Sequence, residues 1–283
     1  MYKNKKFPYL MLLPVILLFI LFTLYPIIYS FYLSFHRQVA GEFEFIGLRN
    51  YARIMNDRTF WTSLQNTLMI LLTQVPIMLF LALVLANMLN NKALKFKSLF
   101  RVGFYLPAVT SLVATSLLFS ILLQDRGLIN NLLSIINIEA IPWLSDSFWA
   151  KASIILALTW RWTGYNMVIY LASLQNISEE LYEAASIDGA GKIRQFFSIT
   201  IPQLKPVILF TTIFSTIGTL QLFDEPYNLT GGGPANSTIT LGLYIYRTGF
   251  NYSNFGYASA LSYVVVIIVV ILSLIQMKLT EER

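Results

Sequence analysis

Arg161 is the residue whose type and position carry the clearest chemical message in this chain. It lies near the middle of residues 148–174, a long apolar segment of the kind that crosses a membrane. A guanidinium facing lipid at that depth would cost at least about 2.5–3.5 kcal/mol, so Arg161 should face a water-filled cavity or a partner. At helical spacing Trp162 and Tyr165 share its face.

A guanidinium beside aromatic rings suits a sugar. The guanidinium donates paired hydrogen bonds to hydroxyls, while the rings stack on the apolar face of the sugar. We therefore expect Arg161, Trp162 and Tyr165 to bind a substrate. The alternative is a structural arginine paired with an acidic group of a partner subunit.

Ser215 and Thr219 form a second polar stripe, one helical turn apart within the apolar residues 206–223. Hydroxyls in apolar helices commonly bond back to their own backbone or across to a neighbouring helix. They can also line a polar path for a solute. The residues alone leave both interpretations open.

Residues 178–202 form a polar island between two long apolar segments. Ser178 can cap a helix whose first turn carries Glu179 and Glu180, where carboxylates complement the helix dipole. Ala184 and Ala185 keep one side of that helix slim, so another surface can lie close to it. The sequence therefore predicts a short surface helix that is ready to contact a partner.

A tight turn and a second helix should follow this surface helix. Gly189 and Gly191 can supply the positive φ angles that such a turn needs. Pro202 is expected to mark the start of the next helix.

Several kinds of chemistry are excluded by residue type. The chain has no cysteine and one histidine, His36, so thiolate metal sites, cysteine nucleophiles and histidine clusters are ruled out. It also lacks the Gly-x4-Gly-Lys-Ser/Thr loop that holds nucleotide phosphates. We therefore expect no catalytic residue, no metal site and no cofactor bound by this chain.

Composition indicates a multi-pass membrane protein. Of its 283 residues, 56% are hydrophobic and 12% are charged, against roughly 25% charged in a soluble domain. We predict an all-α membrane protein with one domain over residues 1–283. Six segments free of acidic residues are the expected spans: residues 7–35, 59–91, 102–124, 148–174, 206–223 and 257–277.

The distribution of basic residues predicts the orientation. An even number of spans places both termini on one side. With that side in the cytoplasm, 12 of the 20 Lys and Arg residues lie inside, which agrees with the positive-inside rule. The polar island at residues 178–202 then also lies in the cytoplasm. There is no nucleic-acid signal in the basic residues.

The polar island resembles the coupling loop of binding-protein-dependent ABC importer permeases. In that family the pattern is E-A-A, three residues, G, nine residues and I-x-L-P. Here Glu183-Ala184-Ala185 is followed at those spacings by Gly189 and by Ile199-Thr200-Ile201-Pro202, with Ile201 in place of the usual leucine. The resemblance implies a type I ABC importer transmembrane domain of six helices with a cytoplasmic coupling helix. It also implies that the residues contacting the ATPase are Glu183, Ala184, Ala185, Asp188, Gly189 and Pro202.

Four further motifs resemble the sugar-importing branch of the family, which includes maltose, oligosaccharide and glycerol-3-phosphate systems. They are FYLP at 104–107, GLIN at 127–130, WRWTGYNM at 160–167 and LTGGGP at 229–234. The resemblance implies that the fourth helix lines the substrate cavity and that the Ser215 and Thr219 stripe faces it. The expected substrate-binding residues are thus Arg161, Trp162, Tyr165, Ser215 and Thr219.

By this resemblance the chain is a permease subunit in the bacterial cytoplasmic (inner) membrane that imports sugars, most simply oligosaccharides. Its expected partners are a second permease in a heterodimer, two ATP-binding subunits that hold ATP and Mg, and an extracytoplasmic solute-binding protein. The chain itself would be surrounded by membrane lipid and would hydrolyse nothing.

Two alternatives remain at this stage. The solute could be glycerol-3-phosphate or another anion, because Arg161 could neutralise a phosphate. An ion-coupled secondary transporter would usually show carboxylates within its spans and an internal repeat. None of the six segments contains Asp or Glu, Asp224 lies just beyond the end of one, and no clear repeat is seen.

Overall fold

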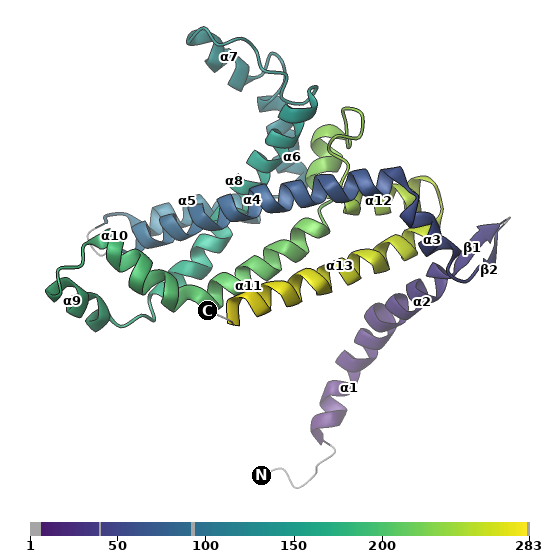
Figure 1. Cartoon of the computed structure of the whole chain (residues 1–283), viewed down its shortest axis with the longest axis horizontal. Helices are drawn as coiled ribbons and strands as arrows, with labels where there is room; N and C mark the ends of the chain where they lie inside the picture. The colour runs from purple at the N-terminus through teal and green to yellow at the C-terminus, as the bar shows by residue number, and fades with distance from the viewer. Residues whose placement is uncertain (1–6, 40, 92–93, 282–283) are drawn as a thin grey trace. The chain divides into compact units, whose positions relative to one another are not determined.

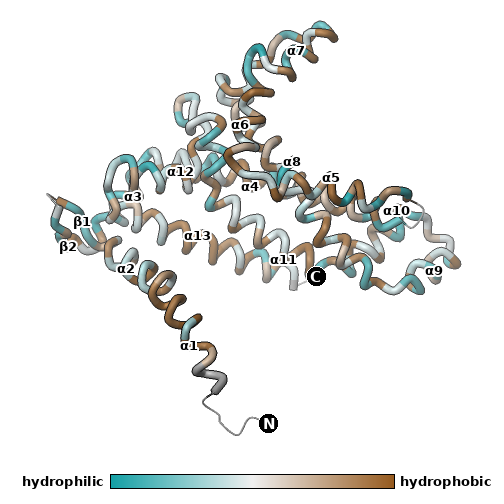
Figure 2. The backbone as a smooth tube through the Cα atoms, turned by 180° about the vertical axis from the view of Figure 1, so that it is seen from behind, coloured by the Kyte–Doolittle hydropathy of each residue, from teal (hydrophilic) through white to brown (hydrophobic). Residues whose placement is uncertain are grey.

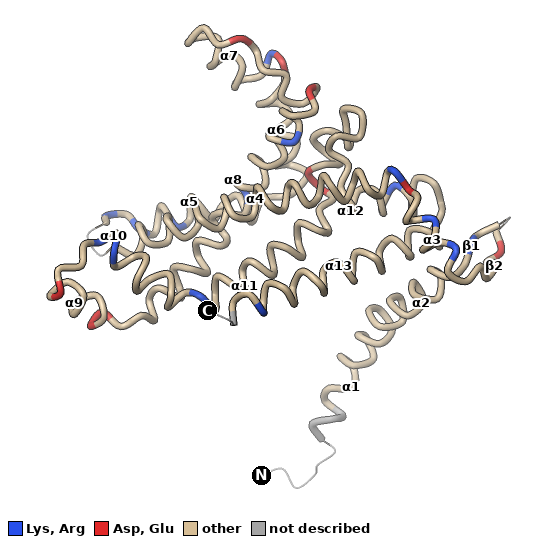
Figure 3. Tube along the Cα trace, viewed as in Figure 1, with Lys and Arg blue, Asp and Glu red and all other residues tan. Residues whose placement is uncertain are grey.

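The computed structural model describes residues 7–39, 41–91 and 94–281, and most of them are helical (Figure 1). Apolar residues follow the long helices (Figure 2), and charged side chains are sparse along α4, α11 and α13 (Figure 3). The chain forms two compact units. One comprises Met1–Arg58 with Ile245–Ile267, and the other comprises Thr59–Tyr244 with Ile268–Arg283.

Within the described residues, four helical stretches are long and apolar enough to cross a membrane: Met11–Ser34, Arg58–Asn90, Lys192–Leu220 and Phe255–Thr280. The predicted third span, residues 102–124, is broken. It forms α5 (Lys97–Val109) and α6 (Leu112–Leu122), bent by 98°. Thr110 takes an extended conformation, with ψ 152°, and ends α5 there. Apolar composition predicted a continuous segment because it does not report such a backbone break.

The predicted fourth span is the 28-residue helix α8 (Ser147–Leu174). It is long enough to cross a membrane but is not among the strongly apolar helices. Polar residues that face the protein interior, including Arg161 and Asn166, account for this difference. The structure therefore shows four apolar spans, or five with the bent pair, in the part of the chain that it describes.

The first unit contains α1 (Phe7–Phe19), η1 (Ile20–Leu24), α2 (Tyr25–Ser34), α3 (Arg49–Met55), η4 (Arg247–Asn251) and the first part of α13 (Phe255–Glu281). The π-helical turn η1 lies just before Pro26. In a regular α-helix the proline ring would clash with a carbonyl group of the preceding turn, and the wider π-helical turn leaves room for it. Tyr263 anchors α13 on α2 by donating to the carbonyl oxygen of Ile27 at 2.6 Å.

The first unit also departs from an all-α fold. Strands β1 (His36–Val39) and β2 (Glu42–Phe45) form an antiparallel hairpin within residues predicted as a loop. Arg37 pairs with Glu44 across it, with 2.6 Å between Nη2 and Oε2. The Arg37 guanidinium holds the pKa of the exposed Glu44 carboxyl below its usual value.

The core of the second unit is formed by α4 (Arg58–Asn90), α8 and α11 (Ile201–Leu220). Small residues such as Ala82 and Ala86 on α4 are fully buried, which lets the helices approach closely. Gly164 likewise lets α8 lie close to α5, because a Cβ added at this position would collide with the carbonyl group of Phe104. This contact joins two of the motifs that the sequence analysis singled out.

Two connections between the predicted spans have defined structures. Residues 125–146 contain α7 (Leu128–Ile135). The Asn130 side-chain amide holds this connection together: it donates to the carbonyl oxygens of Asp125 and Ile141 and accepts from the Trp143 indole at 3.0 Å. The Gly-rich stretch after residue 224 contains η3 (Pro226–Thr230) and α12 (Leu241–Tyr246). Gly231 and Gly232 take φ angles of +56° and +80°, which suit glycine. Asn66 on α4 donates to the carbonyl oxygens of Asn236 and Ile239, each at 3.0 Å.

Candidate functional site

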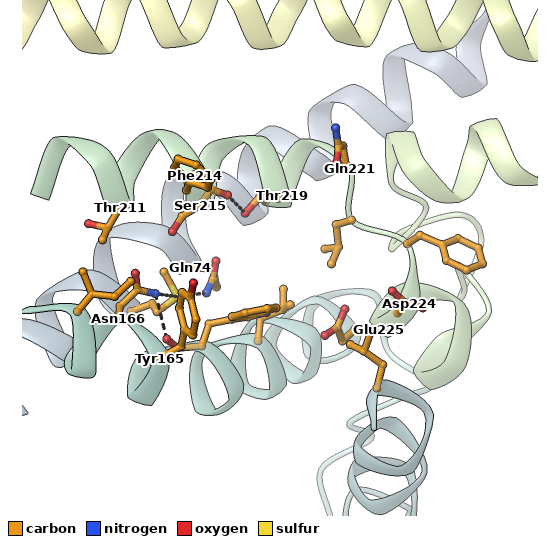
Figure 4. A pocket seen from close by; sticks show the side chains of 18 of the residues that line it. Gln74, Tyr165, Asn166, Thr211, Phe214, Ser215, Thr219, Gln221, Asp224 and Glu225 are labelled. Carbon is orange, nitrogen blue, oxygen red and sulfur yellow. Dashed lines mark hydrogen bonds between the residues drawn. The ribbon is translucent and has the colours of Figure 1, made fainter. Parts of the chain in front are cut away.

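A cavity of about 480 Å³ lies among α4, α8, α11 and the segment that follows α11 (Figure 4). Its wall combines aromatic rings with amide, hydroxyl and carboxyl groups. The lining residues that matter for the argument are Gln74, Trp162, Tyr165, Asn166, Thr211, Ser215, Thr219, Gln221, Asp224 and Glu225.

Four of the residues predicted to bind substrate line this cavity: Trp162, Tyr165, Ser215 and Thr219. The rings of Trp162 and Tyr165 are partly exposed and meet edge to face, with their centroids 5.7 Å apart. Figure 4 shows Tyr165 of α8 and Ser215 of α11 pointing toward one another. Residues separated by some fifty positions in the sequence thus share one polar and aromatic space.

The hydroxyl groups of α11 both bond within their own helix and line the cavity, which are the two interpretations that the sequence left open. Thr219 donates to the carbonyl oxygen of Ser215 at 2.8 Å, so its proton is used within the helix. Its oxygen remains on the cavity wall with lone pairs available to a solute. Thr211, one turn before Ser215, also lines the cavity and contacts the hydroxyl of Tyr170 at 2.7 Å.

Arg161 is placed differently from its neighbours. It is 5% exposed and is not among the residues that line the cavity. Its Nη2 donates to the carbonyl oxygen of Thr110 at 3.0 Å, and its Nη1 donates to Oγ1 of Thr115 at 3.4 Å. The guanidinium therefore binds the break between α5 and α6, and its contact with a substrate stays a prediction.

The structure adds cavity residues that the sequence analysis missed. Gln74 and Asn166 are 3% and 4% exposed, and both are amides within apolar helices. Gln74 donates to the sulfur of Met78 at 3.2 Å, and Asn166 donates to the carbonyl oxygen of Trp162 at 3.0 Å. Amides in predicted spans are costly unless partnered, so these positions carried a detectable signal.

The cavity wall carries two carboxyl groups, Asp224 and Glu225, which follow the end of α11. Glu225 is 4% exposed, and Figure 4 shows its carboxyl group directed into the cavity. Burial raises the pKa of the Glu225 carboxyl, and the positive charge of Arg161 acts in the opposite direction.

The polar island at residues 178–202 begins as predicted. Ser178 caps α9 (Glu179–Ile187) by accepting from the backbone N–H of Glu180 at 3.3 Å. Glu183, Ala184, Asp188 and Gly189 are exposed, and Ala185 is half-buried. Exposed apolar side chains flank them: Ile187 is 87% exposed and Ile193 is 77% exposed. This surface has the composition of a protein contact.

Two details of the island differ from the prediction. Gly189 takes a φ of +76°, but Gly191 has a φ of −67° and caps α10 (Lys192–Gln195) instead. Pro202 lies in the first turn of α11, as predicted, but no break precedes this helix, because the helical run continues from Lys192 to Leu220. The π-helical turn η2 (Phe196–Thr200) lies immediately before Pro202 and widens the backbone where the proline ring would clash with the preceding turn.

Gln195 joins α9 to this long helix. It is 4% exposed, and its Nε2 donates to Oγ of Ser186 at 2.8 Å and to the carbonyl oxygen of Ala190 at 2.9 Å. A second link is the hydroxyl pair of Tyr182 and Thr200, 2.9 Å apart. The same helical run continues to Ser215 and Thr219 on the cavity wall, so α9 and the cavity are connected by one continuous element.

No group of three or more His, Asp or Glu side chains is placed to hold a metal ion within residues 7–39, 41–91 and 94–281.

Comparisons with known proteins agree with this architecture. Residues 55–279 match the family described as "Binding-protein-dependent transport system inner membrane component". The chain is 52% identical to the lactose transport system permease protein LacF of Rhizobium radiobacter, covering 97% of this chain and 94% of that one. It is 37% identical to the arabinooligosaccharide permease AraP of Bacillus subtilis (strain 168), covering 99% and 90%, and 34% identical to the trehalose/maltose permease MalF of Thermococcus litoralis, covering 100% and 96%.

The fold is similar to that of a chain in the crystal structure of a bacterial ABC transporter involved in the import of the acidic polysaccharide alginate. The TM-score is 0.86 with 24% sequence identity, covering 98% of this chain and 95% of that one.

Proposed function

The chain belongs to the family of inner membrane components of binding-protein-dependent transport systems, and we propose that it is a sugar-translocating permease subunit of an ATP-driven ABC importer. It is a transport subunit and not an enzyme. The family predicted from the sequence motifs is thus confirmed. The relatives named above are permeases for lactose, arabinooligosaccharides and trehalose or maltose, which supports an oligosaccharide as the solute.

The observation that carries the proposal is the composition of the cavity. Trp162 and Tyr165 offer partly exposed rings that can stack on a sugar, and Ser215 and Thr219 offer hydroxyl groups opposite them. Gln74 and Asn166 add amides, which can both donate to and accept from sugar hydroxyls. Aromatic faces with several convergent neutral polar groups form the kind of site that a polyhydroxylated solute requires.

We propose that α9 is the coupling helix and that residues 178–202 form the cytoplasmic coupling loop. Glu183, Ala184, Ala185, Asp188 and Gly189 would contact an ATP-binding subunit, supported by the exposed surface around them. Pro202 would act indirectly, through the π-helical turn that precedes it.

The rest of the assembly follows from this function. A second permease would complete the pathway as a heterodimer, two ATP-binding subunits would hold ATP and Mg, and an extracytoplasmic solute-binding protein would deliver the sugar. Closure of the ATP-binding subunits would move α9 and, through the helical run to α11, the wall of the cavity. Transport would then proceed by alternating access between two states that bind these partners differently.

For the membrane topology we propose six crossings in one domain over residues 1–283, with both termini in the cytoplasm. The bent pair α5 and α6 would form one crossing, and α8 would form another that is shielded from lipid by its neighbours. The polar island at residues 178–202 leads into the start of α11, and the Gly-rich stretch after residue 224 follows its end, so a membrane-crossing α11 would separate the two on opposite sides of the membrane.

Neither alternative from the sequence is favoured. A glycerol-3-phosphate site would use Arg161 to neutralise the phosphate, but the guanidinium binds Thr110 and Thr115 away from the cavity wall. An ion-coupled carrier is not what the family comparison supports.

Uptake by the reconstituted transporter tests this function. The chain would be placed in proteoliposomes with its partner permease, ATP-binding subunits and binding protein, and uptake of radiolabelled lactose would be followed. We expect ATP-dependent uptake and expect Trp162→Ala to raise KM about tenfold or more, the equivalent of about 1.4 kcal/mol of lost contact. Phe148→Ala, an exposed aromatic outside the cavity, is the matched control. ATP-dependent uptake that is insensitive to Trp162→Ala would contradict the proposed site.

A further inference from the structure

The ionisable groups on the cavity wall are all of one sign. Asp224 and Glu225 are the acidic residues that line it, and no Lys, Arg or His is among its lining residues in the described part of the chain. The remaining polar groups are neutral amides, hydroxyls and the phenol of Tyr165. This chain therefore presents acidic side chains, and no basic one, to whatever occupies the cavity.

Arg161 does not form part of the cavity wall. Its charge acts on Glu225, but two of its donors are fixed by Thr110 and Thr115, and the side chain is 95% buried. A solute in the cavity would contact the carboxyl group of Glu225, directed inward in Figure 4, whereas Arg161 is not among the residues that line the cavity.

These carboxyl groups would favour the binding of neutral sugars over that of anionic sugars. A carboxylate accepts charge-assisted hydrogen bonds from the hydroxyls of a neutral sugar, which are stronger than bonds between neutral groups. The same carboxylate repels a uronate, an aldonate or a sugar phosphate. That repulsion is large inside a protein, because the low effective dielectric weakens screening.

We propose that Glu225, together with Asp224, is a specificity-determining residue that restricts the cavity to neutral sugars and rejects sugar acids and sugar phosphates. The inference rests on the proposed sugar-transport function and names the charge class of its substrate. Membership of the fold does not decide this point, because the fold relative described above belongs to an importer of an acidic polysaccharide.

The test compares lactose with lactobionate, which keeps the galactose ring and carries a carboxylate. Equilibrium binding of each radiolabelled probe is measured on the purified complex of both permeases and the ATP-binding subunits, with the binding protein left out so that its own selection does not contribute. We expect lactose to bind at least about tenfold more tightly than lactobionate to the wild type, and Glu225→Gln to reduce that ratio to about threefold or less.

A second variant reverses the charge without touching a buried group. Gln221 is exposed and lines the cavity four residues before Glu225, and Gln221→Lys adds a positive charge to the cavity wall. It should raise the affinity for lactobionate several-fold relative to the affinity for lactose. Glu139→Gln removes an exposed carboxylate that does not line the cavity and should leave both affinities unchanged.

The outcomes separate this inference from the function on which it rests. If lactose is imported with ATP but both probes bind alike, or if Glu225→Gln and Gln221→Lys leave the ratio unchanged, the charge selection is overturned and the sugar function stands. If lactose is neither bound nor imported, the sugar function is contradicted and the inference falls with it.

Discussion

At the scale of single residues, Arg161 links the sequence analysis most closely to the structure. That Arg161 is buried within the protein was predictable, because a charged side chain that faces lipid within a membrane span is energetically costly. Its partners were not, because Thr110 and Thr115 belong to a helix break that apolar composition conceals. Helical periodicity and the family resemblance together singled out Trp162, Tyr165, Ser215 and Thr219, and the structure places all four on the wall of one cavity.

The contacts of Arg161 favour a positioning role. Arg161→Lys keeps the charge but cannot donate to both Thr110 and Thr115 in the same geometry. We expect a loss of stability of about 1.5–3 kcal/mol, the value of a hydrogen bond made by a charged group, seen as a lower Tm of the purified complex. The KM for lactose should change by less than about threefold. An unchanged Tm with a large rise in KM would instead show direct contact with the substrate.

Gly164 supports a second prediction at this scale. Gly164→Ala places a methyl group against the backbone carbonyl of Phe104, which cannot rotate away. We expect a destabilisation of about 1–3 kcal/mol from overpacking, measured by thermal unfolding of the complex in detergent. Gly103→Ala on α5, where an added Cβ meets nothing within 4 Å, is the matched control and should unfold like the wild type. Equal Tm values for the two variants would refute the close crossing of α5 and α8.

At the scale of elements, the sequence predicted helices well and their interruptions poorly. The E-A-A island was found as a capped helix followed by a turn, and α9 begins at the predicted capping residue. The continuity of the helix across Pro202 was missed, because a proline usually signals a start or a break, and the π-helical turn that tolerates it has no recognised sequence pattern. The hairpin β1–β2 was missed because its short strands lie within a stretch of mixed polarity.

The attachment of α9 to the long helix can be tested through Gln195. Gln195→Met keeps the side-chain length but removes the amide that binds Ser186 and Ala190. We expect the assembled complex to hydrolyse ATP while importing at least about threefold less lactose per ATP, because movement of α9 is no longer passed on fully. Gln203→Met, at an exposed position on α11, should keep the wild-type ratio. An unchanged ratio in Gln195→Met would show that this amide does not transmit the movement.

At the scale of the whole molecule, composition established a membrane protein, and the E-A-A pattern established its family. Composition could not give the number of crossings, since α8 carries buried polar groups and the third predicted span is bent. The cavity could not be predicted from the sequence for a related reason. It depends on which faces of α4, α8 and α11 meet, whereas periodicity describes each helix separately. Gln74 on α4 illustrates this, because nothing in its own segment relates it to Tyr165.

The central claim is that solute movement through this chain is driven by a partner ATPase that contacts α9. The most direct measurement is lactose uptake together with ATP hydrolysis by the reconstituted complex, comparing wild type with Glu183→Ala and with Glu180→Ala as a control on the same exposed helix. We predict that Glu183→Ala lowers ATP-dependent uptake about tenfold or more while the subunits still assemble, because a contact with the ATPase is lost and the cavity is intact. Glu180→Ala should retain most of the uptake. Uptake that is unaffected by Glu183→Ala, or that persists without any ATP-binding subunit, would contradict the account.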